Sequence, residues 1–233
     1  MPGKILNYQL KNELIKQGAE FVSFVDISNL PEAQNKRFPA AVIFGVSLSA
    51  SYLKEVSQTL DYVPQMIRNK KMAEDEFHCK EIFTDRLADY LAEFLKKKGY
   101  SAYSQSERNI AETGYYNENN KITPLPHKTI AGLAGLGWIG KHNLLITPRY
   151  GSAISMCTVL TDAPLETILK KPLRSKCGNC RICKNTCSTN AITGKSWNKN
   201  THRNHLVDVQ KCTTCLQCLA MCPFTRKYVE KQL

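Results

Sequence analysis

The sequence lacks any apolar run long enough to form a membrane-spanning helix. Such a helix needs about 20 predominantly apolar residues, and no segment of the 233-residue chain approaches that length. The start of the chain, from Met1 to Leu14, mixes apolar residues with Asn, Gln, Lys and Glu and has no signal-peptide apolar block or cleavage site. We therefore expect a cytoplasmic protein with no membrane association.

Low-complexity tracts are also lacking, and no internal repeat occurs apart from one cysteine pattern. A chain of this length favours one main domain with a compact second one. The same context disfavours a disulfide framework, because such frameworks are typical of short secreted chains. The ten cysteines instead indicate metal binding or redox chemistry.

Two cysteine runs share one spacing. Each follows C-x2-C-x2-C-x3-C, and Pro223 comes directly after the second run. This is the pattern of bacterial ferredoxins that carry two [4Fe-4S] clusters, in which three cysteines bind one cubane and the fourth reaches the other cluster. The spacing therefore predicts two ligand sets: Cys177, Cys180, Cys183 and Cys222 for the first cluster, and Cys212, Cys215, Cys218 and Cys187 for the second.

Some cysteine features stand outside this pattern. Ser188 follows the first run where the usual pattern has proline, and we expect a local conformational effect without loss of ligation. Structural zinc is the alternative for C-x2-C pairs, although a doubled triple with a trailing cysteine favours cubanes. Cys79 and Cys157 belong to neither run, and we predict that both are small buried hydrophobes.

The formal net charge is +12. Each cluster with its four thiolates carries about −2, so two clusters leave about +8. A chain this basic favours an anionic partner, and three kinds fit: an acidic electron donor of flavodoxin or ferredoxin type, a phosphate-bearing cofactor, or tRNA. The lysine groups Lys70–Lys71 and Lys96–Lys98 do not decide among them, because charged runs are usually solvated faces.

Hydrophobic spacing predicts a mixed fold before the cysteines. We expect helices at 5–14, 75–98 and 127–134, strands at 21–27, 40–48, 144–147 and 153–160, and a polar loop at 104–125 that lines a site. These elements predict an α/β (α+β) layered domain over residues 1–165. Residues 166–233 form a ferredoxin-like domain, which has too few apolar residues to build a core without its clusters.

Gly135, Gly137 and Gly140 form a G-x-G-x-x-G pattern, which occurs in dinucleotide-binding folds. That function requires a strand before the glycines and a helix after them. Here the run follows a predicted helix, so the pattern alone gives little support for a nucleotide site.

The same glycines lie in Ala134–His142, which reads A-G-L-G-W-I-G-K-H, and the segment Arg149-Tyr150-Gly151-Ser152 and the cysteine runs follow it. Glu76-Phe77-His78 precedes the predicted long helix. This order of motifs, from about Phe38 to Pro223, resembles the epoxyqueuosine reductase family, which is related to reductive dehalogenases.

The resemblance implies a nitroreductase-like layered domain that binds base-off cobalamin near a cluster, with the cluster reducing cobalt to nucleophilic Co(I). It implies a small molecule or a modified nucleoside as substrate. The cofactor would perform the difficult chemistry while the protein sets geometry and potential. Matched to the motif, the residues along the corrinoid would be Trp138, Gly140, Lys141, His142, Asn143 and Ser152.

Two features depart from the family pattern. Members that modify tRNA carry an aspartate proton donor in a D-S-A-P segment, and this chain has Lys121-Ile122-Thr123-Pro124 in that register. Those members also place the first cysteine of the second set well upstream of the others, whereas here the second run is contiguous. They carry a C-terminal extension after the cysteine motif, whereas here ten residues follow Pro223. We therefore expect a paralogue with a substrate other than epoxyqueuosine.

The sequence does not identify a catalytic residue. Candidates for supplying a proton are His127, Tyr115, Tyr116 and His142, because their protons are within reach of neutral-pH chemistry or hydrogen bonding. Two other functions remain open. One is a ferredoxin-type electron carrier, or a reductase of a corrinoid protein, without substrate chemistry of its own. The other is a flavin-dependent reductase on the same scaffold.

Overall fold

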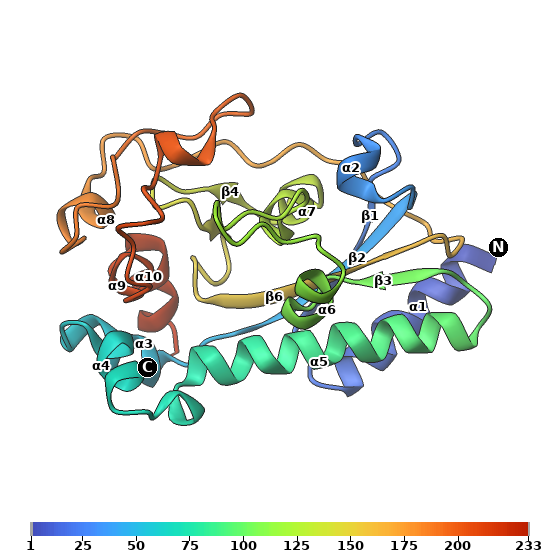
Figure 1. The fold of residues 1–233 in the computed structure, drawn as a ribbon, viewed down its shortest axis with the longest axis horizontal. Coiled ribbons are helices and arrows are strands. Elements are labelled where there is room, and N and C mark those ends of the chain that lie inside the picture. Colours follow the sequence, from blue (N-terminus) through green and yellow to red (C-terminus); the bar gives the residue numbers. More distant parts are fainter. Residues whose placement is uncertain (1, 233) are drawn as a thin grey trace. The chain divides into compact units, whose positions relative to one another are not determined.

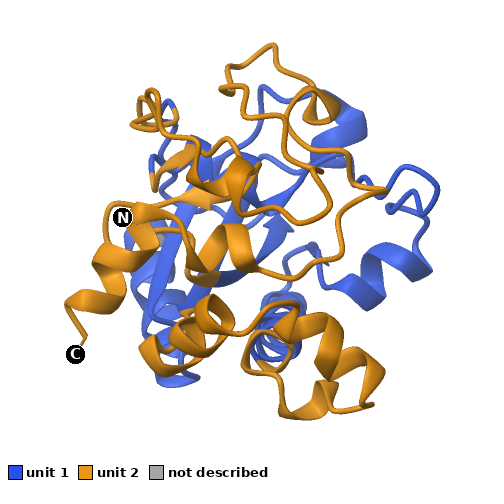
Figure 2. Ribbon diagram, turned by 90° about the vertical axis from the view of Figure 1, so that its left-hand side faces the viewer, with its two compact units in different colours: residues 1–46, 80–135, 155–171 blue, residues 47–79, 136–154, 172–233 orange. Residues whose placement is uncertain are grey.

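The computed structural model describes residues 2–232, which fold as a mixed α/β protein. Its contacts divide into two compact units, coloured separately in Figure 2. Unit 1 comprises Met1–Val46, Lys80–Gly135 and Ser155–Lys171, and unit 2 comprises Ser47–Cys79, Leu136–Ile154 and Pro172–Leu233. Each unit draws on three separate segments, so the division into domains at residue 165 stays a prediction.

Unit 1 is built on a sheet with strand order β1-β2-β6-β3 (Figure 1). β1 (Phe21–Asp26) pairs antiparallel with β2 (Ala40–Ser47), and β3 (Ala102–Ser104) pairs antiparallel with β6 (Ile154–Thr161). The predictions of β1, β2 and β6 are confirmed. β3 was not predicted, because three residues are too few to show a period-two alternation.

Helices α1 (Pro2–Lys16) and α5 (Glu76–Lys97) confirm two further predictions, and Gly18 and Gly99 follow them with φ of 106° and 87°. Leucines at helical spacing on both helices pack against alternate residues of the strands, which lie on one face of the sheet. Burying each such side chain contributes about 1.5–3 kcal/mol. The apolar cluster includes Leu6, Leu10, Leu14, Phe24, Val42, Phe44, Leu87, Leu91, Leu95, Cys157 and Val159.

The opposite face of this sheet meets α7 (His127–Leu133), which was predicted as a helix and contacts β1. The side chain of His127 contacts that of Thr158. Successive side chains of a strand point to opposite faces, so the Thr158 side chain lies on the face opposite to Cys157 and Val159. Helices therefore lie on both faces of the sheet, while the nitroreductase-like character of this layering stays a prediction.

The expectation of an unbroken loop over residues 104–125 is wrong in part, because α6 (Glu107–Glu112) lies within it. Ser106 caps this helix by accepting a hydrogen bond from the backbone N–H of Asn109 at 3.4 Å. Serine is among the preferred residues at this position. A single capping serine is a weak signal in a segment whose overall composition is polar, so the sequence did not predict this helix. Unit 1 also contains the one-turn helix α2 (Glu32–Asn35).

Unit 2 combines short helices with a small hairpin. The hairpin pairs β4 (Trp138–Ile139) with β5 (Leu145–Ile146), and β5 was predicted. The other elements are α3 (Ala50–Gln58), α4 (Tyr62–Arg68), η1 (Met72–Glu74), α8 (Ile182–Asn185), η2 (Arg203–His205), α9 (Gln217–Ala220) and α10 (Pro223–Glu230). Among residues 2–232, no helix has the length and apolar character needed to cross a membrane.

A buried amide connects α3 with α9 inside unit 2. The Nε2 group of Gln217 donates to the carbonyl oxygen of Thr59 at 2.9 Å and also to that of Val56. The last carbonyls of a helix have no partner within the helix, so a side chain has to satisfy them when they are buried. Gln217 supplies both hydrogen bonds and positions the neighbouring Cys218.

Candidate functional site

The first cysteine run is a tight turn followed by one helical turn. The N–H of Cys180 donates to the carbonyl of Cys177 at 2.8 Å, and Gly178 between them has φ of 42°. Cys183 lies in α8, and Cys187 follows that helix. The local geometry therefore brings the first three cysteines around one point and carries the fourth away.

The second run wraps in a similar way but without glycine. Thr214 and Leu216 adopt left-handed backbone conformations with φ of 54° and 59°. Such conformations cost about 1–3 kcal/mol each in residues other than glycine and cluster at ligand-binding sites. Cys222 then occupies the N-cap position of α10, with Pro223 at the first helical position, where the missing N–H of proline is harmless.

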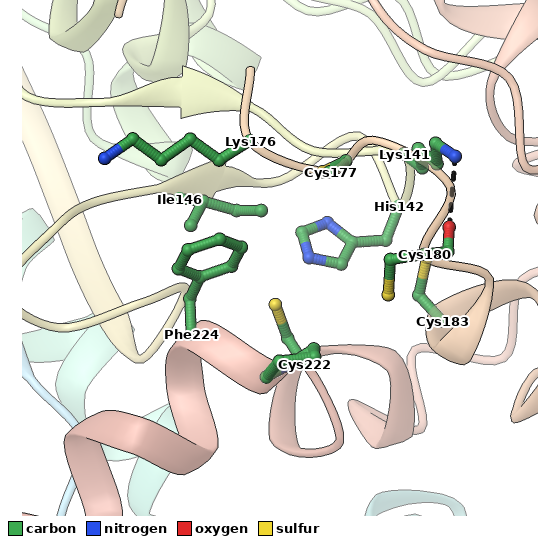
Figure 3. Close-up of a pocket in the computed structure, with 10 residues that line it drawn as sticks. Lys141, His142, Ile146, Lys176, Cys177, Cys180, Cys183, Cys222 and Phe224 are labelled. Carbon is green, nitrogen blue, oxygen red and sulfur yellow. Dashed lines mark hydrogen bonds between the residues drawn. The ribbon is translucent and has the colours of Figure 1, made fainter. Parts of the chain in front are cut away.

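Cysteines of the two runs meet in one cavity of about 190 Å³ (Figure 3). A site for one water needs only about 10–15 Å³, so the cavity has room for a group much larger than a single ion. Apolar side chains of Ile146 and Phe224 form part of its wall. The cysteines that line it are Cys177, Cys180, Cys183 and Cys222.

The pKa values of these thiols reflect their burial first and their crowding second. Burial raises the pKa of Cys183 to about 11, and the neighbouring Cys222, Cys177 and Cys180 add to the shift by charge repulsion. Burial and then the other cysteines of its set likewise raise the pKa of Cys218. Positively charged iron would remove this repulsion and favour thiolates. The donor chemistry therefore fits two iron–sulfur clusters.

Cys187 differs from these thiols. Burial acts against its ionisation, but hydrogen bonds from Thr189 and from the backbone N–H of Ala191 outweigh that effect and lower its pKa. The sulfur lies 3.3 Å from the Ala191 nitrogen. N–H groups aimed at a ligand sulfur are one way in which a protein stabilises a cluster thiolate.

A single-ion site is not formed by these side chains. In the part of the chain that the structure describes, no group of three or more His, Cys, Asp or Glu residues converges on a position for one metal ion. Tetrahedral zinc requires four ligands within about 2.3 Å of one point. Metal analysis distinguishes zinc from iron at these cysteines. Cys157 is buried as predicted, whereas Cys79 is exposed and donates to the carbonyl of Ala73, so the prediction of a buried Cys79 is wrong.

The β4–β5 hairpin forms another wall of the cavity. Trp138 is 1% exposed and packs with Ile146 and Cys222, and its ring meets that of Phe224 edge-on at 4.9 Å. The Nε1 donor of Trp138 is buried and has no hydrogen-bond partner among the described residues. A buried donor without a partner is rare in proteins, and a cluster sulfur would satisfy it.

His142 and Lys141 lie in the turn of the hairpin, and both line the cavity (Figure 3). The Nδ1 atom of His142 accepts from the N–H of Leu144 at 3.1 Å, so in the neutral ring Nε2 carries the proton and faces Ser152 Oγ at 3.4 Å. Lys141 donates to two carbonyls of the first cysteine run. Both side chains are thus directed toward the cysteines.

Gly140 leaves room for this ring. A Cβ on Gly140 would lie 2.6 Å from Cε1 of His142 and 2.7 Å from Cδ1 of Ile146. Asn143 completes the turn with φ of 65° and is half-buried. The helix α7 ends before Gly135, and a hairpin, with Gly140 in its turn, takes the place of the helix that should follow, so the context of a dinucleotide-binding motif is absent from residues 2–232.

The Arg149–Ser152 segment packs on Thr225, three residues after the last cysteine of the motif. The N–H of Ser152 donates to Oγ1 of Thr225 at 3.0 Å, and a Cβ on Gly151 would lie 2.4 Å from the Thr225 nitrogen. Sequence reasoning missed Thr225 and Phe224 as parts of the site, although their position directly after Cys222 and Pro223 was a usable signal.

The proton-donor candidates other than His142 belong to unit 1. His127 Nδ1 lies 2.9 Å from Thr158 Oγ1, whose hydroxyl donates to Oε1 of Gln105, while the amide of Gln105 donates to the carbonyl of Leu125. The network makes Nδ1 of His127 a donor. Burial lowers the pKa of His127 to about 4, so the ring is neutral at pH 7 and is a poor proton donor.

The two tyrosine candidates for supplying a proton also belong to unit 1. Tyr115 is buried and donates its hydroxyl proton to the carbonyl of Gln34, and its ring meets that of Tyr103 edge-on. Burial raises the pKa of Tyr115 to about 12. Tyr116 is half-buried.

Comparison with known proteins agrees with the cysteine pattern. Residues 176–225 match the family model of a 4Fe-4S dicluster domain. The epoxyqueuosine reductase of Aliivibrio fischeri is 28% identical over 170 residues, which is 70% of this chain and 41% of that protein. The epoxyqueuosine reductase of Synechococcus sp. CC9605 is 49% identical over 70 residues, which is 30% of this chain and 21% of that protein. The alignments thus span less than half of these relatives.

Solved structures share the fold. A catabolic reductive dehalogenase in complex with 3-bromo-4-hydroxybenzoic acid matches with a TM-score of 0.66 and 20% identity over 96% of this chain and 33% of that chain. An epoxyqueuosine reductase with a modified tRNA stem loop matches with a TM-score of 0.55 and 17% identity over 94% of this chain and 66% of that chain. At such identities the likeness concerns the fold alone.

Proposed function

Because this chain is a sequence relative of the epoxyqueuosine reductases, we propose that it is an iron–sulfur oxidoreductase that passes electrons from two [4Fe-4S] clusters to a bound cobalamin. One observation carries the proposal. The hairpin that the resemblance associates with the corrinoid packs against the cysteines of the first cluster. The residues that hold the cluster and those that would hold the cofactor are therefore neighbours within unit 2.

The chain's own residues have distinct roles in this proposal. The two cysteine sets hold the clusters, and Trp138, Ile146 and Phe224 exclude water from the first one, which is one way to set its potential. Bound cobalamin would supply the redox chemistry. The side chains of Trp138, Lys141 and His142 are directed toward the cysteines. The corrinoid contact in the hairpin turn is therefore Asn143, whose side chain is half-buried.

The second cluster is the point of electron entry. Its ligand Cys212 is exposed, whereas Cys183 and Cys222 of the first cluster are buried. Between residues 172 and 229 the sequence has many lysines and arginines and one acidic residue, Asp208. Such a surface favours an acidic donor of flavodoxin or ferredoxin type, because complementary charge accelerates encounter.

The substrate is a small molecule or a modified nucleoside other than epoxyqueuosine. The segment that would carry the proton-donor aspartate is a tight turn in unit 1, in which Asn117 and Ile122 exchange backbone hydrogen bonds and Lys121 has φ of 50°. No carboxylate stands at that position of the sequence. tRNA remains an alternative partner, to be tested by filter binding across a salt series.

Titration with cobalamin under anaerobic conditions tests the cofactor. We expect the reconstituted protein to bind micromolar cobalamin and to give a base-off absorption spectrum. Asn143→Ala should weaken this binding, whereas Asn190→Ala should not. Asn190 is the matched control, because it also lies in unit 2 and has a positive φ, of 53°.

Failure to bind cobalamin would contradict the cofactor assignment while leaving the clusters intact. Clusters that cycle normally in a protein without a cofactor would then indicate an electron carrier. Release of a yellow flavin on denaturation would indicate a flavin-dependent reductase.

A further inference from the structure

Lys141 is a buried cation with an unusual set of partners. Its side chain is 7% exposed, and its ammonium donates to the carbonyl oxygen of Gly178 at 2.7 Å and to that of Cys180 at 3.0 Å (Figure 3 shows one of these bonds). Lysine is almost never fully buried unless it is paired. Two of its three donors are therefore committed to the turn that presents the first cysteines.

The charge of this ammonium is not balanced by a carboxylate. Within residues 2–232, no acidic side chain forms an ion pair with Lys141. Carbonyl oxygens offer only partial negative charge, and a buried charge without a counter-charge is costly. The same cavity is lined by four cysteines, and a [4Fe-4S] cluster with four thiolates carries about −2. A cluster bound in this cavity would supply the missing counter-charge.

We propose that Lys141 is a positioning residue of the first cluster, which clamps the Cys177–Cys180 turn and raises the reduction potential of that cluster. This inference rests on the clusters of the proposed function and is independent of cobalamin. A fixed positive charge in a cavity of low dielectric stabilises the reduced cluster, which carries one more negative charge. It also gives Lys141 a role different from the corrinoid contact that the resemblance implies.

Two substitutions separate the effect of the Lys141 hydrogen bonds from the effect of its positive charge. Lys141→Gln keeps hydrogen-bond donors and removes the charge, and Lys141→Met removes both. Lys199→Gln is the matched control, because Lys199 lies in the same unit, is exposed and is not among the residues that line the cavity, so that solvent screens its charge. Redox titration followed by electron paramagnetic resonance resolves the two clusters, and iron analysis shows whether both are present.

We expect Lys141→Gln to retain both clusters and to shift the first one toward more negative potential. The reduced-to-oxidised ratio at a fixed potential should fall at least tenfold, which is about 59 mV for one electron. The second cluster should shift much less, and Lys199→Gln should leave both potentials near those of the wild type. Lys141→Met should show the same shift or lose the first cluster selectively.

Unchanged potentials in both Lys141 variants, with the wild-type iron content, would overturn the inference and leave the proposed function standing. Joint loss of both clusters would overturn it as well, because the clamp touches only the turn of the first set. Absence of iron from the wild-type protein would instead overturn the proposed function itself.

Discussion

Cys183 and Cys222 line one cavity although they belong to different cysteine runs. We therefore predict that the fourth ligand of each cluster comes from the other run, so that loss of that ligand affects only one cluster. We expect Cys222→Ser to retain about four irons per chain, against about eight in the wild type. Analysis of iron and acid-labile sulfide in anaerobically purified protein measures this.

Cys187→Ser is the reciprocal test and should remove the second cluster while the first remains. Cys79→Ser is the control, because Cys79 is exposed and outside both sets, and it should keep about eight irons. If Cys222→Ser and Cys212→Ser abolished the same paramagnetic signal, the crossed assignment would be wrong.

Gly140→Ala should destabilise the hairpin turn. Its new methyl group would lie within 2.7 Å of atoms of His142 and Ile146, both of which line the cavity. Overpacking of this kind costs about 1–3 kcal/mol. Chemical unfolding of the cluster-loaded protein should show the loss, and a variant as stable as the wild type would contradict the close packing of the His142 ring.

Gln217→Met should lower the free energy of unfolding by about 1–3 kcal/mol, because it leaves two buried carbonyls at the end of α3 without a donor. Gln65→Met is the matched control. Gln65 also donates to a carbonyl, that of Leu60 at 2.8 Å, but it is exposed, so water replaces the lost bond. Equal effects of the two substitutions in urea unfolding would argue against a buried role for Gln217.

The pKa of His127 makes stability depend on pH. Because burial lowers that pKa from 6.5 to about 4, the unfolded chain takes up the proton first as the pH falls. The contribution of the neutral ring is therefore complete above about pH 6.5 and decreases toward pH 4.

Between pH 7.5 and 5.5 we expect the wild type to lose about 1 kcal/mol more than His127→Gln does. Urea unfolding at the two pH values measures the difference. A wild type and a variant that lose stability in parallel would show that His127 titrates normally in the folded protein.

The repeating patterns of the sequence predicted most of the fold of unit 1. The leucines of α1 and α5 and the alternating strands β1, β2 and β6 carry a periodic signal over many residues. α6 and β3 were not predicted because they are short and depend on single caps or on a partner strand. Periodicity reports which face of an element is buried, but it does not report which distant segment covers that face.

The site shows the same limit. Cysteine spacing predicted that Cys177, Cys180, Cys183 and Cys222 belong together, because the geometry of a cubane constrains the spacing, and these four line one cavity. The motif at Trp138–Asn143 identified the residues of interest but not their neighbours. The turn at Gly140 and Asn143 directs Lys141 and His142 toward the cysteines, and that direction depends on the hairpin, which residue identity alone does not reveal.

Metal and sulfide analysis of anaerobically purified protein tests the central claim most directly. Two clusters held by eight cysteines require about eight irons and about eight acid-labile sulfides per chain. Zinc in place of iron, or fewer than about four irons after anaerobic reconstitution, would contradict the account.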